Sequence, residues 1–245
     1  MEIQLTKTKL SEELFSPLFG TWWSRVRPFF LSGGFDDIYK RLKSDSARGK
    51  QIAPLSSHVF RCFQETPLDE VRAVLCGMAP YHTFYNNVPI ADGLLMSCSI
   101  TGRLQPSLIK FYDSMDRSVN GGLNLQMVRD PDLSYLSRQG ILMLNSSLST
   151  EKGKPGNHAE IWEPFMKFLF EEVLITNGIP VVFLGREAAK LKRYVTPFTW
   201  IFELVHPAAA AYASSDWNEE DIFNKINRIL KENNGDTIQW IKTDL

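Results

Sequence analysis

The sequence predicts an α/β fold, with residues 1–245 forming a single domain of three α/β/α layers around a central, mainly parallel four-stranded sheet. Four short apolar runs lack the polar–apolar alternation of a half-exposed strand, which is typical of strands covered on both faces. Segments with helical spacing of apolar residues accompany these runs, and such alternation favours parallel strands joined by right-handed crossovers. The chain contains no internal repeat, low-complexity tract or long linker that would divide it. The apolar runs are, in chain order, Val71–Cys76, Ile141–Leu144, Pro180–Leu184 and Trp200–Val205.

Three segments are expected to be helices. The first begins at Ser11 and continues through SEELFSPLFGTWWSRV, with acidic residues in its first turn. The second and third carry apolar stripes along one face. These stripes consist of Ile161, Phe165, Phe168, Leu169 and Val173, and of Ile222, Ile226, Ile229 and Leu230.

Polar residues gather where the predicted strands end. The loop GMAPYH, residues 77–82, follows the first strand, and Asn145 follows the second. The third strand leads to Gly185 and Arg186, and the fourth to His206 and Pro207. Ligands of open α/β sheets bind outside the carboxyl ends of the strands, so these residues are expected to form one polar cleft without a strong nucleophile.

Composition excludes several classes of protein. The chain is 44% hydrophobic and 22% charged, an ordinary globular balance that allows a sizeable core. Three cysteines without a CxxC pair argue against a disulfide framework or a thiolate metal site and indicate a reducing compartment. Four scattered histidines likewise predict no metal site, and no cofactor is expected. No apolar run indicates a signal peptide or a membrane span, and the net charge of −1 permits nucleic-acid binding only through a local basic patch.

The motifs resemble, in order and from about Trp22 onward, those of uracil-DNA glycosylase of the widespread bacterial, eukaryotic and viral type. TPLDEVRAVLCGMAPYH is similar to the family's TPFDEVKVVILGQDPYH, and DLSYLSRQGILMLNSSLST to its DLSGWARQGVLLLNTVLTV. ADGLLMS, QPSLIKFYDSM, VVFLGREAAKLK and HPAAAAY resemble further family segments. So many ordered matches are more specific than any single short motif.

The resemblance implies roles for individual residues. Enzymes of this family flip the target base out of DNA and read its edge in a tight pocket. Asn145 would pair with uracil, Tyr81 would exclude the methyl group of thymine, and His206 would donate a hydrogen bond to the departing base. Gly77 and Met78 would complete the pocket, the latter with its backbone. DNA contacts would come from Gln105, Pro106, Ser107, Gly185, Arg186, Pro207, Ala208, Ala210 and Tyr212.

Four positions depart from the family pattern. Ala79 replaces the aspartate that positions the attacking water, and Met96 replaces the phenylalanine that stacks on uracil. The leucine loop, whose tip enters the duplex, becomes AAAAY, residues 208–212. Asp92 stands where the family has a histidine; it is either a substitute for the lost acid or a solvent-exposed turn residue before Gly93.

Several of these signals also have an ordinary structural interpretation. Met96 could fill the core instead of stacking on a base. The alanine run could start a helix, because alanine has the highest helix propensity, or form a blunt wedge tipped by Tyr212 or Trp217. The basic cluster Lys190, Lys192 and Arg193 could be a solvated face or a DNA contact.

Three functions follow for comparison. The leading one is a slow uracil-DNA glycosylase that hydrolyses the N-glycosidic bond in base excision repair, acting as a monomer on single- or double-stranded DNA. The second is an inactive relative that binds DNA or a protein partner, and the third is a glycosylase for another base. The expected location is the cytoplasm, or the nucleus or a viral factory for a eukaryotic or viral gene.

Overall fold

The computed structural model describes residues 12–123, 127–174, 176, 178–197 and 199–242, and it contains the predicted four-stranded sheet. The strands are β2 (Ala73–Gly77), β5 (Ile141–Asn145), β7 (Pro180–Leu184) and β8 (Trp200–Leu204). They lie in the order β5-β2-β7-β8, and every neighbouring pair is parallel. The α/β class and the four predicted strands are therefore confirmed.

The two central strands and β5 are buried along their whole length, which explains their continuous apolar sequence. In contrast, β8 at the other edge of the sheet is only partly buried, and its first residue, Trp200, is half exposed. Register brings the ends of two strands together, because Gly77 of β2 is paired with Asn145 of β5. The carboxyl ends that carry the candidate residues therefore meet at one edge of the sheet.

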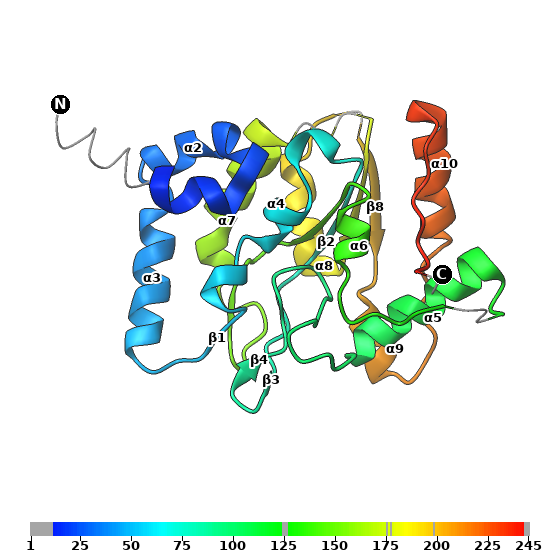
Figure 1. Ribbon diagram of the computed structural model, residues 1–245, viewed down its shortest axis with the longest axis horizontal. Coiled ribbons are helices and arrows are strands. Elements are labelled where there is room, and N and C mark those ends of the chain that lie inside the picture. Colours follow the sequence, from blue (N-terminus) through cyan, green and yellow to red (C-terminus); the bar gives the residue numbers. More distant parts are fainter. Residues whose placement is uncertain (1–11, 124–126, 175, 177, 198, 243–245) are drawn as a thin grey trace.

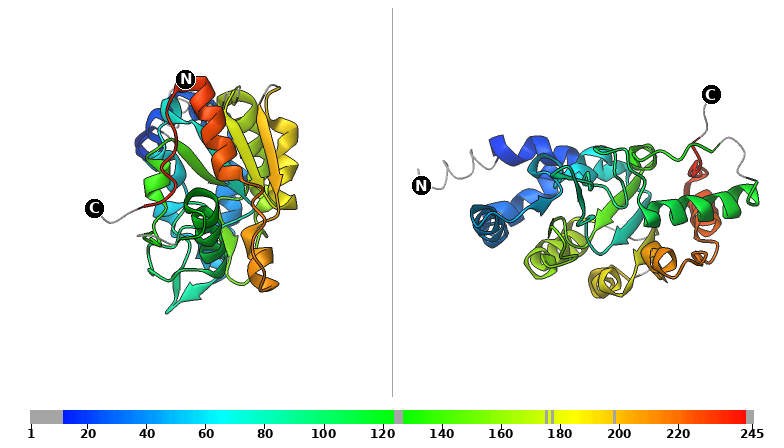
Figure 2. Two further views of the ribbon diagram at one scale, coloured as in Figure 1. Left: turned by 90° about the vertical axis from the view of Figure 1, so that its right-hand side faces the viewer. Right: turned by 90° about the horizontal axis from the view of Figure 1, so that it is seen from below.

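Helices cover both faces of the sheet (Figures 1 and 2). In the right-hand view of Figure 2, α7 (Ala159–Phe168) and α8 (Arg186–Ala189) lie below the strands. On the strands themselves, α8 contacts β2 and β7, and α4 (Arg61–Glu65) and α6 (Ser134–Ser137) contact β5. The remaining helices are α2 (Trp23–Leu31), α3 (Asp36–Ala47), α5 (Pro106–Asn120), α9 (Pro207–Tyr212) and α10 (Ile222–Asn234).

The expected helices form, with local differences. Residue 11 lies outside the described residues, residues 12–19 are helical, and the helix breaks at Gly20. Gly20 has φ +51°, a left-handed conformation that an L side chain disfavours, and the chain continues through a 3₁₀ turn into α2. The second helix is α7 followed by a π-helical turn over Leu169–Val173, and the third is α10.

An aromatic cluster joins the amino-terminal helices to α7. Phe19 contacts Phe60, Phe63 and Phe165 with ring centroids 4.5–6.2 Å apart, distances at which aromatic pairs attract. Trp22 is fully buried and donates its indole N–H to the Thr66 carbonyl at 2.7 Å. The described residues before β2, 12–72, therefore pack against the sheet although they contribute no strand to it.

Two small antiparallel ladders complete the fold. In the first ladder, β1 (Ile52–Ala53) pairs with β6 (Thr150–Glu151), the element that follows β5 in the chain. A hairpin of β3 (Phe84–Tyr85) and β4 (Val88–Pro89) projects from the lower edge of the molecule in Figure 1, where α9 and the beginning of α5 also lie. Among the described residues, no helix is long and apolar enough to cross a bilayer.

Candidate active site

The candidate site is centred on Gly77, the last residue of β2. A methyl group added at this glycine would lie 3.1 Å from Asn145 Oδ1 and 3.8 Å from His206 Nε2. It would also come within 2.4 Å of Leu95 Cδ1, closer than real Cβ atoms approach other atoms. A side chain at this position would therefore force Leu95 to move and would crowd Asn145, and Asn145 and His206 face the same small volume.

Asn145 ends β5 and is 3% exposed. Its Oδ1 atom is buried and has no hydrogen-bond partner among the described residues. Buried polar atoms in native proteins are nearly always paired, so an unpaired one requires an explanation. An acceptor oxygen beside a donor NH₂ group is suited to a ligand that offers both an N–H and a carbonyl.

The ring of His206 is held by the turn that begins α9. Its Nδ1 accepts a hydrogen bond from the backbone N–H of Ala208 at 3.1 Å. In the neutral ring the proton must then reside on Nε2, which makes the atom beside Gly77 a donor. Burial lowers the pKa of His206 from 6.5 to about 4, so the ring is neutral at pH 7.

Two loops are joined across the site. The carbonyl of Gly77 accepts from the Ser146 N–H at 2.8 Å. The carbonyl of Met78 accepts from the Ser147 N–H at 3.0 Å and from the Ser146 hydroxyl at 2.8 Å. The loop after β2 and the loop after β5 are therefore held in a fixed relation, which keeps the pocket wall rigid.

Tyr81, in the loop after β2, forms a hydrogen bond with Ser107, in the first turn of α5. Their hydroxyl oxygens are 2.7 Å apart, and burial raises the pKa of the Tyr81 phenol, so the phenol stays protonated. Ser107 is 4% exposed, so its hydroxyl is directed at Tyr81 rather than at solvent. At the start of α5, Gln105 is half-buried and Pro106 is exposed.

The loops after β7 and β8 lie side by side. A methyl group added at Gly185 would lie 3.4 Å from the Cβ atom of His206, and the Gly185 N–H donates to the Leu204 carbonyl. Gly185 has φ +89°, which favours glycine. Arg186, the next residue, is exposed.

The alanine run forms α9, as the helix interpretation predicted. Pro207 and Ala210 are buried and Ala208 is half-buried, whereas Tyr212 at the end of the helix is 88% exposed. The alternative prediction that Trp217 forms the wedge is wrong, because this residue is buried and donates its indole N–H to the Val205 carbonyl. Tyr212 is therefore the exposed aromatic tip of this segment.

Asp92 is not the exposed turn residue that the sequence suggested. Its carboxylate is fully buried and lies 2.8 Å from Arg61 Nη1. Further hydrogen bonds come from the backbone of Leu94 and Ser99 and from the hydroxyls of Ser97 and Ser99. With these partners the carboxylate ties Arg61 to the segment of residues 94–99, a geometry that does not favour the role of a substitute acid. Met96 is buried as well and has φ +58°.

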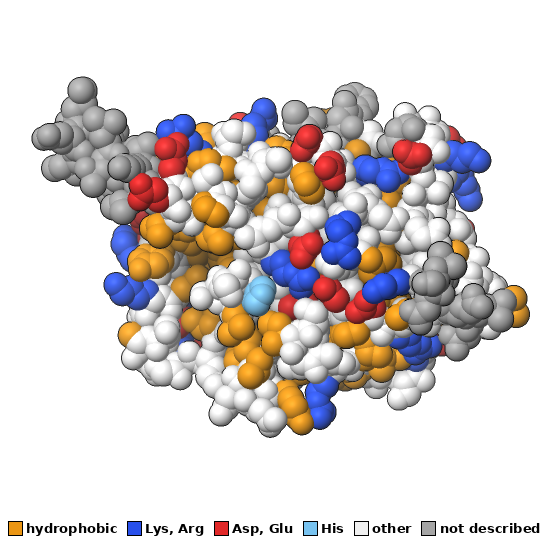
Figure 3. Space-filling view, viewed as in Figure 1, with side chains coloured by type: hydrophobic (Ala, Val, Ile, Leu, Met, Phe, Trp, Pro, Cys, Tyr) orange, Lys and Arg blue, Asp and Glu red, His pale blue; other side chains and the backbone are white. Residues whose placement is uncertain are grey.

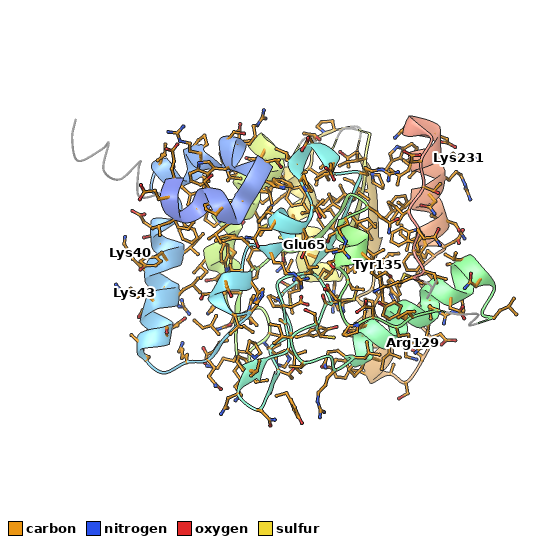
Figure 4. All side chains as sticks on the ribbon, in the orientation of Figure 1. Lys40, Lys43, Glu65, Arg129, Tyr135 and Lys231 are labelled. Carbon is orange, nitrogen blue, oxygen red and sulfur yellow. The ribbon has the colours of Figure 1, made fainter. Side chains whose placement is uncertain are left out.

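Ala79 is half-buried within the loop of residues 77–82. The basic cluster is neutralised locally, because Lys190, Lys192 and Arg193 contact Glu187, Glu203 and Glu163 respectively. Lys40 and Lys43 on α3, and Lys231 on α10, project outward from helices at the sides of the molecule (Figure 4). These cations are not gathered at the pocket.

The sequence did not predict a chain of buried polar contacts next to the loop that follows Asn145. Ser149 accepts from the Trp162 indole at 2.8 Å, and its hydroxyl is 3.0 Å from His158 Nδ1. On the other side of the ring, His158 Nε2 lies 3.3 Å from Asp45 of α3. All three polar side chains are fully buried, and no periodic pattern marks them.

Comparisons with known proteins agree with this geometry. The sequence pattern of the Uracil DNA glycosylase superfamily matches residues 63–231. The uracil-DNA glycosylase of Campylobacter lari is 29% identical over 98% of both chains, and uracil-DNA glycosylase 1 of Listeria innocua is 32% identical over 87% of this chain and 91% of the relative. The crystal structure of mimivirus uracil-DNA glycosylase superimposes with a TM-score of 0.78 at 24% identity, covering 98% of this chain and 91% of that one, which shows the shared fold. A match across more than half of the residues, together with relatives of this identity, places the chain in the uracil DNA glycosylase superfamily.

Proposed function

We propose that the protein is a uracil-DNA glycosylase, which hydrolyses the bond between uracil and deoxyribose and leaves an abasic site. The observation that carries this proposal is the unpaired, buried Oδ1 of Asn145 next to the Nε2 donor of His206 above Gly77. A planar base with an N–H group between two carbonyls satisfies both side chains at once. Superfamily membership supports the same assignment.

Each residue has a role in the proposed reaction. Asn145 pairs with N3–H and O4 of the flipped base, and the Tyr81 ring excludes a methyl group at C5. As the glycosidic bond breaks, negative charge develops on the base and positive charge on the sugar. His206 donates from Nε2 to O2, where a preorganised donor is worth roughly 10²–10³-fold in rate.

Loss of the acid at Ala79 slows the reaction without abolishing it. A positioned acid or base contributes about 10²–10⁴-fold, whereas total enzymatic accelerations typically exceed about 10⁶-fold. Recognition through Asn145 and charge stabilisation through His206 do not depend on that acid. We therefore expect measurable but slow turnover.

The test is uracil release from a labelled single-stranded oligonucleotide, followed by alkali, which breaks the strand at abasic sites. Strand scission with uracil, and none with thymine at the same position, is the expected result. His206→Asn serves as the matched variant, because it keeps a polar side chain but removes the Nε2 donor. No scission at high enzyme concentration would overturn the assignment.

The second candidate is a protein that binds DNA or a protein partner without cleaving the base. The half-buried Ala79, where an acid is expected, favours it. Tight binding to uracil-containing DNA with no base release would support this candidate, and steady turnover would exclude it. Release of a different modified base, but not of uracil, would indicate the third function.

A further inference from the structure

The hairpin of β3 and β4 grows directly out of the pocket loop. It begins two residues after Tyr81 and closes at Ile90, whose N–H donates to the Thr83 carbonyl at 3.1 Å. Asn86 and Asn87 occupy the turn with φ +48° and +62°, the pair of left-handed residues that a tight two-residue hairpin requires. The tip is therefore a defined structure that projects from the edge of the site.

The hairpin carries two aromatic rings, and a cation from another segment lies over each of them. Tyr85 is 41% exposed, and the Arg103 guanidinium lies 3.6 Å from its ring centroid. On the neighbouring residue Phe84, the ring has the Lys152 ammonium 5.2 Å from its centroid. Figure 3 shows hydrophobic side chains and a Lys or Arg side chain at the lower edge where the hairpin lies.

The two cations beside the hairpin, Arg103 and Lys152, differ from most other basic residues of the protein. Within the described part of the chain, neither Arg103 nor Lys152 forms a salt bridge with a carboxylate; Lys152 donates instead to the neutral Gln51. Lys190, Lys192 and Arg193, by contrast, are each paired with a glutamate. Two cations without acidic partners, beside an exposed ring, are complementary to a strand that offers phosphates and base faces.

We propose that this hairpin is a stacking platform for an unpaired nucleotide flanking the uracil. This proposal rests on the proposed function, which sets the path of the DNA strand. A base stacks on the exposed part of the Tyr85 ring, and Arg103 and Lys152 contact the adjacent phosphates. Aromatic platforms with basic neighbours bind single strands in this way, with little regard to sequence. In an intact duplex both faces of each base are covered by its neighbours, so the platform contributes only where the strand is single or locally melted.

The test measures binding without any uracil, so that it does not depend on turnover. Fluorescence anisotropy is recorded with a labelled oligothymidylate, with an intact duplex, and with an oligomer of abasic units that has phosphates but no bases. Tyr85→Ala should weaken oligothymidylate binding about tenfold, whereas Tyr85→Phe keeps wild-type affinity because stacking uses the ring. Binding to the duplex and to the abasic oligomer should change by less than about twofold.

Tyr39→Ala is the matched control, since Tyr39 is 53% exposed and has Lys43 5.8 Å from its ring centroid, but it lies on α3. Arg103→Ala should reduce the salt dependence of oligothymidylate binding by about 0.7 in logarithmic slope, the value for one phosphate of a single strand. Equal losses for Tyr85→Ala and Tyr39→Ala, or equal losses on all three ligands, would overturn the proposal. If the binding pattern holds while the wild type releases no uracil, the platform stands and the proposed reaction fails.

Discussion

Asn145 Oδ1 and His206 Nε2 both face the space above the Gly77 Cα atom, and a single methyl group there would lie 3.1 Å from the first and 3.8 Å from the second. The two side chains come from strands that are not neighbours, since β5 and β8 are the outer strands of the sheet. Gly77 at the end of β2 therefore determines the space that both side chains line.

Gly77→Ala should lower the rate of uracil release by roughly 10²-fold, because displacement of a binding group by about 1 Å has that effect. The added methyl group must push aside Leu95 and the Asn145 amide. Single-turnover rates on a single-stranded substrate measure the change, with circular dichroism to show that the variant is folded. A wild-type rate would show that Asn145 does not need its present position.

The pKa of His206 makes a prediction about pH. Because this pKa is lowered to about 4 in the folded protein, the acid limb of kcat/KM that belongs to this ring should lie near pH 4 rather than near 6.5. The unfolded chain binds a proton on this ring below about pH 6.5, whereas the folded chain does not until about pH 4. Stability should therefore be independent of this group above pH 6.5 and fall as the pH drops towards 4.

His206→Asn should remove that share of the pH dependence in urea unfolding. It should also reduce the rate about 10²–10³-fold, because the Nε2 donor is lost. An acid limb near pH 6.5 in the wild type would contradict the neutral, donor-bearing ring.

Ala79→Asp should increase turnover by about 10²–10⁴-fold. The position is half-buried, so a carboxylate there keeps contact with water and does not have to be desolvated. Parallel progress curves of both proteins on one uracil substrate give the ratio, and Ala79→Asn controls for size. Unchanged turnover would mean that another group already positions the water.

Asp92→Asn should lower the free energy of unfolding by about 1–3 kcal/mol, because the buried groups that donate to this carboxylate lose a charged acceptor while Arg61 keeps Glu65 and Asp132. The charge of Arg61 would lose its closest buried partner, and two serine hydroxyls would lose an acceptor. Urea titration measures the change. Normal stability with lost turnover would instead identify Asp92 as the substitute acid.

Tyr212→Ala should slow uracil release from duplex DNA at least about tenfold and leave single-stranded substrate nearly unaffected. A side chain inserted into the duplex offsets unstacking, which costs a few kcal/mol and is smallest for a single strand. Tyr212 is 88% exposed at the end of α9, where it is free to insert. Equal losses on both substrates would indicate a phosphate contact rather than a wedge.

The sequence predicted the strands well because each is a short apolar run, fully buried in β2, β5 and β7 and partly buried in β8, and the strand ends then located Asn145 and His206. The strand order could not be predicted, since a parallel sheet of apolar runs has no marker for which strands are neighbours. Asp92 was misjudged because its partners, Arg61 above all, are distant in sequence. Similarly, nothing local shows that Asp45 supports His158.

The β3–β4 hairpin was missed for a different reason. Its strands have two residues each, too few to show any periodicity. Asn86 and Asn87 were a usable signal, because asparagine tolerates the left-handed conformation of tight turns.

The hydrogen bond from the Ala208 N–H to His206 Nδ1 lies in the first turn of α9, the helix that ends at Tyr212. The same short helix holds the ring that faces the base and carries Tyr212 at its far end. A movement of α9 as Tyr212 enters the duplex would therefore also move the amide that fixes the proton on Nε2. The donor is kept only while this short helix holds its place, so the contact with the duplex and the hydrogen bond to the base depend on the same six residues.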